Sequence, residues 1–520
     1  MSTVADHVAQ ALYARGTRHA WGMPGGDSLH LVRAFAEAGI AFHLVRDEAS
    51  AGFAADASAQ LSGAPGACLA TLGPGLTNMV SGVVGCWLDR APVLALTSRY
   101  RTDRRGVYTH MMFDQSRLLD ATAKATWRLT ADGAAGEVRR ALAVAHAPRP
   151  GPVWLEIPNE VAGAPHTSDP LPLPPAPAPA TPHAALVQRV AQWTRPVVLV
   201  GFAARHTDVP ALAERLRAPV ITTYKAKGAL PEGEGWAAGA AGLSPVADAV
   251  HRQLVDRADG LLLLGWDPAE LRDHWLPGWG PAPEVVVLDT ASPTDLPTRL
   301  DAVHVGDLAG AVDALVGSAS SWTEDDVRAH RAAHDAVFHE TVFGPATAIR
   351  AVQAAVGDDV VVTLDVGAHR ITAAHVWQAA RPDRLLQSNG FSSMGYGLPA
   401  ALAAAAHGHR AVAITGDMGL QMVLGELVTA AENEWPLCVV VLDDATLSLI
   451  ALKQERLEHP DRGVRFANPA WEALARSVGA RCVLADSGEA VRAAVASALE
   501  HDGITLVAAR IDDAPYRDQM

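Results

Sequence analysis

Two groups of acidic residues stand where strand-like runs of the sequence end. Asp417 closes one apolar run, and Asp443-Asp444 closes the next, with a helical stretch of about Leu420–Glu432 between them. If the two runs are neighbouring parallel strands, the carboxylates meet at one edge of a sheet beside a helix N-terminus. Mg²⁺ prefers oxygen ligands, and helix N–H groups bind phosphate oxygens, so this pattern suits a magnesium diphosphate. An acidic residue after a strand can also simply cap the next helix.

The elements that would position these carboxylates alternate along the whole chain. Short apolar runs rich in Val, Leu and Ile are separated by helical patterns in three successive stretches. This alternation predicts doubly wound parallel sheets, so we expect an α/β protein of three consecutive domains. The runs expected to be strands are 66–73, 92–98, 152–158, 195–202, 218–225, 260–266, 284–290, 359–367, 410–417, 437–444 and 503–510.

Two segments of different composition separate the three stretches. Ala164–Pro182 is rich in proline and is expected to be an extended linker. Gly317–Phe343 contains a charged stretch, which we interpret as a connecting helix, and the next domain then starts near Pro345. The predicted domains are residues 1–165, 183–317 and 345–520.

Composition excludes several classes of function. The chain of 520 residues has a formal net charge of -15, which argues against nucleic-acid binding because no basic stripe could offset it. No run approaches the roughly 18 apolar residues of a membrane helix, and the N-terminus lacks the apolar core of a signal peptide. The four cysteines are not at metal-ligand spacing and are expected to be buried thiols. We therefore expect a cytoplasmic protein that binds neither membrane nor nucleic acid.

The segment around the acidic groups resembles the diphosphate-binding motif of thiamine-diphosphate-dependent enzymes, such as acetolactate synthase, benzoylformate decarboxylase and pyruvate decarboxylase. Met418 replaces the second glycine of the family's Gly-Asp-Gly triplet, and Asp443-Asp444 replaces its Asn pair. The resemblance implies that Mg²⁺ is held by the side chains of Asp417 and Asp444 and by the backbone carbonyl of Thr446. Aspartate remains a good ligand for Mg²⁺. The other residues that the resemblance places at the diphosphate are Gly416, Met418, Gly419 and Leu447.

Two more segments of the C-terminal stretch resemble the same family. Residues 392–401 are similar to the segment beneath the thiazolium, where a bulky apolar side chain, here Met394, bends the cofactor into a V shape. Taken alone, this methionine would be interpreted as core filler. Residues 364–369 are similar to the family's other diphosphate loop. The cofactor-binding residues that these segments imply are Gly367, Ala368, His369, Ser392 and Met394.

The N-terminal stretch resembles the family's pyrimidine-binding domain. Glu48 stands where the family has its cofactor-activating glutamate, whose carboxyl group hydrogen-bonds pyrimidine N1′. The alternative for one glutamate at a helix start is a favourable interaction with the helix dipole. The other cofactor-binding residues implied here are Pro24, Gly25 and Thr71.

Residues that face the substrate are less strongly indicated. His110 lies with Tyr108, Thr109 and Gln115 in a stretch where the family places polar groups near the substrate. It is the candidate acid or base, and the alternative is a solvated loop histidine. Neither the 2-oxo acid nor the fate of the product, release as an aldehyde or transfer to an acceptor, follows from the sequence.

The resemblance also bears on the central stretch and on assembly. Central domains of the family bind FAD, ADP or nothing. Val200–Asp208 has one glycine where a dinucleotide fingerprint has three, so we expect an empty domain and keep FAD open. The family's active sites lie between chains, which implies a homodimer or homotetramer. The resemblance implies thiamine-diphosphate- and Mg²⁺-dependent decarboxylation or carboligation of a small 2-oxo acid. The alternatives are a catalytically silent or regulatory protein of this fold and a flavin-dependent oxidoreductase.

Overall fold

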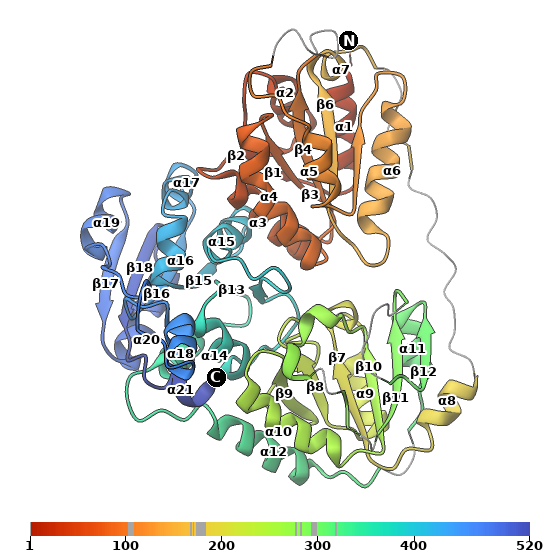
Figure 1. Ribbon diagram of the computed structural model, residues 1–520, viewed down its shortest axis with the longest axis vertical. Coiled ribbons are helices and arrows are strands. Elements are labelled where there is room, and N and C mark those ends of the chain that lie inside the picture. Colours follow the sequence, from red (N-terminus) through yellow and green to blue (C-terminus); the bar gives the residue numbers. More distant parts are fainter. Residues whose placement is uncertain are drawn as a thin grey trace.

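Three parallel sheets organise the chain (Figure 1). The computed structural model describes residues 2–101, 109–166, 169, 171–172, 184–233, 235–275, 278–280, 283–292, 299–317 and 320–520. Each sheet has six strands, and every strand pair within it is parallel. The predicted fold of three consecutive α/β units is confirmed, whereas the exact domain boundaries stay a prediction.

The N-terminal domain has the strand order β2-β1-β3-β4-β6-β5. Its central strands are fully buried runs of small and branched apolar residues, as expected for a parallel sheet covered by helices on both faces. The strands are β1 (His19–Met23), β2 (Ala41–Leu44), β3 (Gly66–Ala70), β4 (Val93–Arg99), β5 (Ala125–Arg128) and β6 (Val153–Pro158). The helices are α1 (Val4–Ala14), α2 (Leu29–Ala38), α3 (Glu48–Ser62), α4 (Pro74–Leu88), α5 (Gln115–Asp120), α6 (Ala134–His146) and α7 (Asn159–Ala162).

The central domain has a different order, β9-β8-β7-β10-β11-β12, which is that of dinucleotide-binding folds. The direction of winding reverses between β7 and β10. Its strands are β7 (Pro196–Val200), β8 (Val220–Thr223), β9 (Ala237–Ala241), β10 (Gly260–Leu264), β11 (Glu284–Asp289) and β12 (Ala302–Val305). Its helices are α8 (Ala184–Val190), α9 (Val209–Leu216), α10 (Pro245–Asp256) and α11 (Leu308–Ala314), and α12 (Glu324–Ala336) is the expected connecting helix.

The C-terminal domain repeats the order of the first sheet, β14-β13-β15-β16-β18-β17. Its strands are β13 (Val361–Leu364), β14 (Leu385–Gln387), β15 (Ala411–Gly416), β16 (Leu437–Asp443), β17 (Arg481–Ala485) and β18 (Ile504–Arg510). Its helices are α13 (Pro345–Gln353), α14 (Ala368–Val376), α15 (Gly397–Ala406), α16 (Asp417–Met422), α17 (Glu426–Glu432), α18 (Ser448–Arg456), α19 (Trp471–Ser477), α20 (Gly488–Leu499) and α21 (Tyr516–Gln519).

The helix expected over Leu420–Glu432 is broken into α16 and α17. At the break, a Cβ on Gly425 would lie 2.7 Å from Cβ of Arg46 in the N-terminal domain. Directly after it, Glu426 Oε1 accepts hydrogen bonds from the backbone N–H groups of Arg46 and Asp47, at 2.9 and 3.2 Å. Contact with another domain, which local periodicity does not encode, accompanies the break.

The N-terminal and C-terminal domains share one apolar core. Helices α3 and α15 lie side by side (Figure 1), and both are rich in alanine, which lets their backbones approach closely. Buried alanines of α3 and α15 belong to a single cluster that also includes side chains of β3, β4, β15 and β16. Among the described helices, none combines the length and the apolar character needed to cross a bilayer.

Candidate functional site

A cavity of about 230 Å³ opens at the carboxyl ends of β13, β15 and β16 in the C-terminal domain. The winding of this sheet reverses between β13 and β15, the position at which open α/β sheets bind ligands. The structure brings together here all the C-terminal residues expected from the sequence to contact cofactor or metal. They are Gly367, Ala368, His369, Ser392, Met394, Gly416, Asp417, Met418, Gly419, Asp444, Thr446 and Leu447.

Two carboxylates, the buried Asp417 and the half-buried Asp444, form one wall of the cavity. Asp417 accepts hydrogen bonds from the N–H groups of Met418 (2.8 Å) and Ala445 (2.7 Å). Asp444 accepts from the Thr446 N–H at 2.9 Å and from the Ser448 hydroxyl at 2.5 Å. Because Asp417 accepts from the N–H of Ala445, the residue next to Asp444 after β16, the two carboxylates belong to one structural unit.

Burial disfavours the ionised form of these two carboxyl groups. It raises the pKa of Asp417, and it raises the pKa of Asp444 to about 7, with the nearby Asp417 charge adding to the effect. In the described part of the chain neither carboxylate forms an ion pair with Lys or Arg. A divalent cation would supply the missing positive charge, and two carboxylates with the Thr446 carbonyl are an oxygen donor set that fits Mg²⁺.

The opposite wall is the N-terminus of α14 with His369. Burial lowers the pKa of this imidazole to about 4, so the ring is neutral in the ligand-free chain. Its Nε2 is buried and has no hydrogen-bond partner among the described residues. The ring fits only because its neighbours are glycines: a Cβ on Gly367 or Gly416 would lie 2.7 or 3.2 Å from its Cε1. A phosphate oxygen beside Nε2 would give this nitrogen a partner and favour its protonated form.

Sequence reasoning missed the side chains that hold this site together. Asn468 donates through Nδ2 to Asp417 at 2.7 Å and to Asp443 at 2.6 Å. Asp365 accepts from the Gly395 N–H at 2.8 Å and from the Thr415 hydroxyl at 2.9 Å. Asp365 directly follows β13, so the rule that identified Asp417 would have found it. Asn468 lies 51 residues from Asp417 along the chain and gave no local signal.

Asp443 faces away from the expected metal position. Its carboxylate accepts from Asn468 and from the Trp471 indole N–H at 3.0 Å. Of the two adjacent aspartates, Asp444 alone lines the cavity.

The residues expected from the N-terminal domain form a second group, in the segments that follow β1, β2 and β3. Glu48 is buried, and its Oε2 accepts a hydrogen bond from Asn78 Nδ2 at 3.1 Å. A Cβ on Gly75 would lie 3.1 Å from Glu48 Oε1 and 2.8 Å from Thr71 Cγ2, and a Cβ on Gly25 would lie 2.4 Å from Thr71 Oγ1. Pro24 precedes Gly25 directly after β1. Asn78 is a contact that sequence reasoning missed.

Capping does not account for Glu48. The N-cap of α3 is Asp47, whose carboxylate accepts from the Ala49 N–H at 2.8 Å. Glu48 is the following residue, and it points toward Asn78 on α4 instead of the N–H groups of its own helix. Glu48 nevertheless lies in the first turn of α3, where a carboxylate interacts favourably with the helix dipole, so both interpretations of this residue remain compatible with the geometry.

The two groups of expected residues do not meet within one described chain. The side chains that line the C-terminal cavity all belong to the C-terminal domain, and none comes from the described residues of the N-terminal domain. His110 lies on an exposed turn after β4 and lines neither this cavity nor the larger cavity of the central domain. Tyr108 lies outside the described residues.

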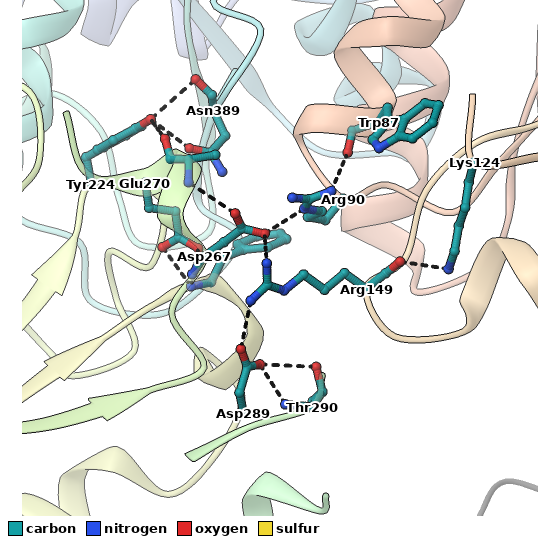
Figure 2. Close-up of polar contacts among 12 residues, drawn as sticks. Trp87, Arg90, Lys124, Arg149, Tyr224, Asp267, Glu270, Asp289, Thr290 and Asn389 are labelled. Atoms are coloured by element: carbon teal, nitrogen blue, oxygen red, sulfur yellow. Dashed lines mark hydrogen bonds and ion pairs between the residues drawn. The ribbon is translucent and has the colours of Figure 1, made fainter. Parts of the chain in front are cut away.

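A larger cavity, of about 340 Å³, lies at the carboxyl ends of β7, β10 and β11 of the central domain. Figure 2 shows that arginines of the N-terminal domain reach into it. Arg149 pairs with Asp289 at 3.0 Å and with Asp267 at 3.5 Å, and Arg90 pairs with Asp267 at 2.6 Å. These pairs join the two domains across the cavity.

The turn after β7 has no free N–H groups for a diphosphate. The Phe202 N–H donates to the buried Glu270 carboxylate at 3.0 Å, and the Ala203 N–H donates to the Gly265 carbonyl at 3.1 Å. The Ala204 N–H donates to the Gly201 carbonyl at 3.1 Å. A dinucleotide such as FAD binds its diphosphate on unpaired N–H groups at this turn, so the residues here do not fit FAD.

Three buried histidines, His251, His334 and His375, lie between the central and C-terminal domains with ligand atoms within 4.8 Å of one another. His251 uses both ring nitrogens, on His330 (3.0 Å) and on the Ala240 carbonyl (3.0 Å). His375 uses both as well, on the Ser244 N–H (3.1 Å) and on His334 (3.2 Å). Rings that are satisfied in this way leave no lone pair for a metal.

Comparison with known proteins assigns the class. The thiamine pyrophosphate enzyme family is matched by its N-terminal TPP binding domain over residues 2–118, its central domain over 183–315 and its C-terminal TPP binding domain over 365–509. The chain belongs to this family, and the cofactor that the family defines is thiamine diphosphate.

Three individual relatives are named as acetolactate synthases or their large subunits. The chain is 28% identical over 534 residues to the acetolactate synthase isozyme 2 large subunit of Escherichia coli, covering 98% of this chain and 95% of the relative. It is 27% identical over 479 residues to a probable acetolactate synthase large subunit of Methanocaldococcus jannaschii, covering 86% and 81%. It is 29% identical over 542 residues to the chloroplastic acetolactate synthase 2 of Zea mays, covering 96% and 84%. The chain thus resembles acetolactate synthases along nearly its whole length.

Proposed function

We propose that this protein is a Mg²⁺- and thiamine-diphosphate-dependent enzyme that decarboxylates a small 2-oxo acid and transfers the remaining fragment to an acceptor or releases it as an aldehyde. The observation that carries the proposal is the C-terminal cavity. On one side it has a buried and a half-buried carboxylate, neither of them paired with a Lys or Arg of the described residues, and on the other a buried histidine nitrogen without a hydrogen-bond partner among those residues. These are the deficits that a magnesium diphosphate would fill.

Each group has a distinct task in this proposal. Asp417, Asp444 and the Thr446 carbonyl hold Mg²⁺, while His369 and the N-terminus of α14 hold the diphosphate. Met394 supports the thiazolium ring from below. When bound, thiamine diphosphate would supply a nucleophilic carbon to attack the substrate carbonyl and a cationic ring to take up the electron pair of the carbon–carbon bond broken in decarboxylation. Glu48 holds a proton at pyrimidine N1′, and His110 is the candidate acid or base for the substrate.

We propose further that the enzyme is a homodimer or homotetramer with its active sites between chains. Glu48 and its neighbours form a compact group that lines no part of the C-terminal cavity of their own chain. A symmetric dimer would bring this group to the cavity of a second copy. Sedimentation that finds a fully active monomer at assay concentration would contradict this assembly.

The same proposal includes an empty central domain and a cytoplasmic location. The central cavity is crossed by ion pairs, and the N–H groups of its first turn are used internally. All four cysteines are free thiols, which fits a reducing compartment. A flavin-dependent oxidoreductase would show a flavin absorbance spectrum after purification, and we expect none.

The decisive experiment is a product screen. Purified protein is incubated with thiamine diphosphate, Mg²⁺ and pyruvate or other small 2-oxo acids, with and without an aldehyde or a second 2-oxo acid as acceptor. We expect release of CO₂ with formation of an aldehyde or a coupled 2-hydroxy ketone, and loss of both when EDTA removes the metal. Protein that binds the cofactor but yields no CO₂ from any member of the panel would favour a catalytically silent or regulatory protein.

A further inference from the structure

The segment from Gln387 to Gly395 joins β14 to α15 and contributes Ser392 and Met394 to the wall of the C-terminal cavity. Ser392 has a backbone φ of 55°, in the left-handed region that side chains other than glycine rarely adopt. Such a conformation persists only where surrounding contacts impose it. The contacts that hold this segment therefore matter for the shape of the cavity.

The central domain holds the beginning of the segment. Tyr224, directly after β8, is buried, and its hydroxyl donates to the Asn389 side-chain oxygen at 2.7 Å (Figure 2). The neighbouring Lys225 donates through Nζ to the Gln387 carbonyl at 2.5 Å. The Gln387 amide in turn donates to the Tyr224 carbonyl at 2.8 Å. A domain that binds no expected part of the cofactor thus contacts the segment with side chains and backbone.

The N-terminal domain holds the same residues from another side. Asp89 is the C-cap residue of α4 and is fully buried. Its Oδ1 accepts a hydrogen bond from the Asn389 N–H at 2.6 Å and lies 3.4 Å from the Ser388 hydroxyl. The backbone and the side chain of Asn389 are thereby fixed by two different domains.

The C-terminal domain completes the set of contacts. Arg370 is buried beside His369 and donates through Nη1 to the Ser388 carbonyl at 2.5 Å and through Nη2 to the Ser392 hydroxyl at 3.0 Å. Asp365 accepts from the Gly395 N–H at 2.8 Å. All three domains therefore converge on one short segment of the cavity wall.

We propose that Tyr224 and Asp89 are positioning residues of the cofactor site, which act from the central and N-terminal domains by holding Asn389 so that Ser392 and Met394 face the cavity. The inference rests on the proposed function, because it assigns Met394 to the thiazolium. It gives the central domain a part in cofactor activation that needs no ligand of its own. The diphosphate and metal positions lie on other loops, so their affinity should depend little on this contact.

The test compares Tyr224→Phe, which removes one hydroxyl group, with the wild-type protein. Both are loaded with thiamine diphosphate and Mg²⁺. Three quantities are measured: cofactor affinity from tryptophan fluorescence, the near-ultraviolet circular dichroism of the bound cofactor, and hydrogen–deuterium exchange at thiazolium C2. We expect exchange to slow on the order of tenfold to a hundredfold, the scale of a misplacement of about 1 Å at a reacting group. Affinity should change by less than about threefold on the same reasoning.

Asp89 provides a second pair of variants. Asp89→Ala removes the acceptor of the Asn389 N–H and should also slow exchange. Asp89→Asn keeps one acceptor oxygen in place and should recover most of the wild-type rate, which a purely structural defect would not predict. Ser244→Ala is the matched control, because it removes two buried hydrogen bonds of the central domain away from the segment, one to the Gln519 carbonyl at 2.6 Å and the N-cap bond from the Ala247 N–H at 3.1 Å. Its exchange rate should equal that of the wild-type protein.

The outcomes separate this inference from the function on which it rests. Wild-type protein that binds the cofactor without C2 exchange would overturn the proposed function. Wild-type exchange that is matched by Tyr224→Phe and Asp89→Ala, with unchanged circular dichroism, would overturn this inference alone. If Tyr224→Phe fails to fold, the Asp89→Ala and Asp89→Asn pair still decides: equal rates in the two variants would contradict positioning.

Discussion

The central and C-terminal domains carry cavities at the same place in their sheets, yet they differ in how their polar groups are satisfied. In both, the cavity lies at the carboxyl ends of parallel strands where the winding reverses, between β7 and β10 or between β13 and β15. In the central cavity Asp267 and Asp289 are paired with arginines. In the C-terminal cavity, among the residues that the structure describes, Asp417 and Asp444 accept hydrogen bonds from neutral donors and pair with no Lys or Arg.

This difference shows that the fold determines where a cavity lies. The polar groups that lack a charged or hydrogen-bonding partner indicate which cavity binds a ligand and what chemistry that ligand has. The central domain has the strand order of dinucleotide-binding folds, but its turn after β7 is internally hydrogen bonded. Strand order alone would have predicted a nucleotide there. The smaller cavity is the better candidate site because its carboxylates and His369 still need partners.

The largest expected effect comes from removing a proposed metal ligand. Asp417→Ala should abolish retention of thiamine diphosphate, because the remaining negative charges would repel the diphosphate without a firmly held cation. Cofactor binding with and without Mg²⁺, followed by tryptophan fluorescence, measures the effect. Asp443→Asn is the comparison variant: Asp443 does not line the cavity but shares the Asn468 donor with Asp417, so its substitution should weaken binding less than Asp417→Ala does. Loss of binding in Asp443→Asn but not in Asp417→Ala would reverse the assignment.

Glu48→Gln should leave folding and cofactor affinity largely intact, because glutamine keeps the size of the side chain and an acceptor for Asn78. It removes the carboxyl proton at pyrimidine N1′, so C2 exchange and turnover should fall on the order of 10²–10⁴-fold. Asp47→Asn, which keeps the N-cap of α3, should exchange like the wild-type protein. Wild-type exchange in Glu48→Gln would exclude Glu48 from the mechanism.

Substitutions in the central cavity should change the stability of the protein and leave cofactor binding and catalysis unchanged. Arg149→Leu leaves the buried Asp289 carboxylate without its partner and should destabilise the protein by about 2 kcal/mol in urea unfolding. Adding Asp289→Asn should restore part of this loss, since the unpaired charge is then gone. Arg328→Leu, which removes an ion pair between side chains that are 68% and 83% exposed, should change stability by less than about 0.5 kcal/mol. A large drop in cofactor affinity in Arg149→Leu would contradict this separation of the two cavities.

The smallest effect is expected for Asp444→Asn, which restores the residue usual in the family's motif. Asparagine can accept from the Thr446 N–H and donate to the Ser448 hydroxyl, so the local hydrogen bonds survive. Activity should remain within about tenfold of the wild-type value, roughly 1.4 kcal/mol. Activity measured over a range of Mg²⁺ concentrations tests this expectation. A complete loss that excess Mg²⁺ does not relieve would mean that the second aspartate has another task.

The parts of the fold that the sequence predicted are those with strong local patterns. Central strands such as β10 and β16 are continuous apolar runs, which burial on both faces of a parallel sheet requires. Strand β9 was missed because Ala and Gly carry no strand preference, and β14 was missed because it has only three residues. The break between α16 and α17 depends on Arg46, which is far away in sequence.

The residues of the candidate site also divide into those that the sequence could predict and those that it could not. Residues directly after strands, such as Asp417 and Asp444, could be found because strand ends are positions where sheets bind ligands. Asn468 and Asn78 could not be found, because only the folded chain brings them to Asp417 and Glu48. The closure of the central cavity by Arg149 depends on packing between domains and has no signature in the local sequence.

The convergence of three domains on Asn389 has a consequence for the order of folding. Domains of a long chain generally fold as units, with the N-terminal one first during synthesis. The segment around Asn389 cannot be fully ordered until Asp89, Tyr224 and Arg370 are all in place. These residues belong to the N-terminal, central and C-terminal domains, respectively. Competence to activate the cofactor should therefore appear last in refolding, after each sheet has acquired its secondary structure.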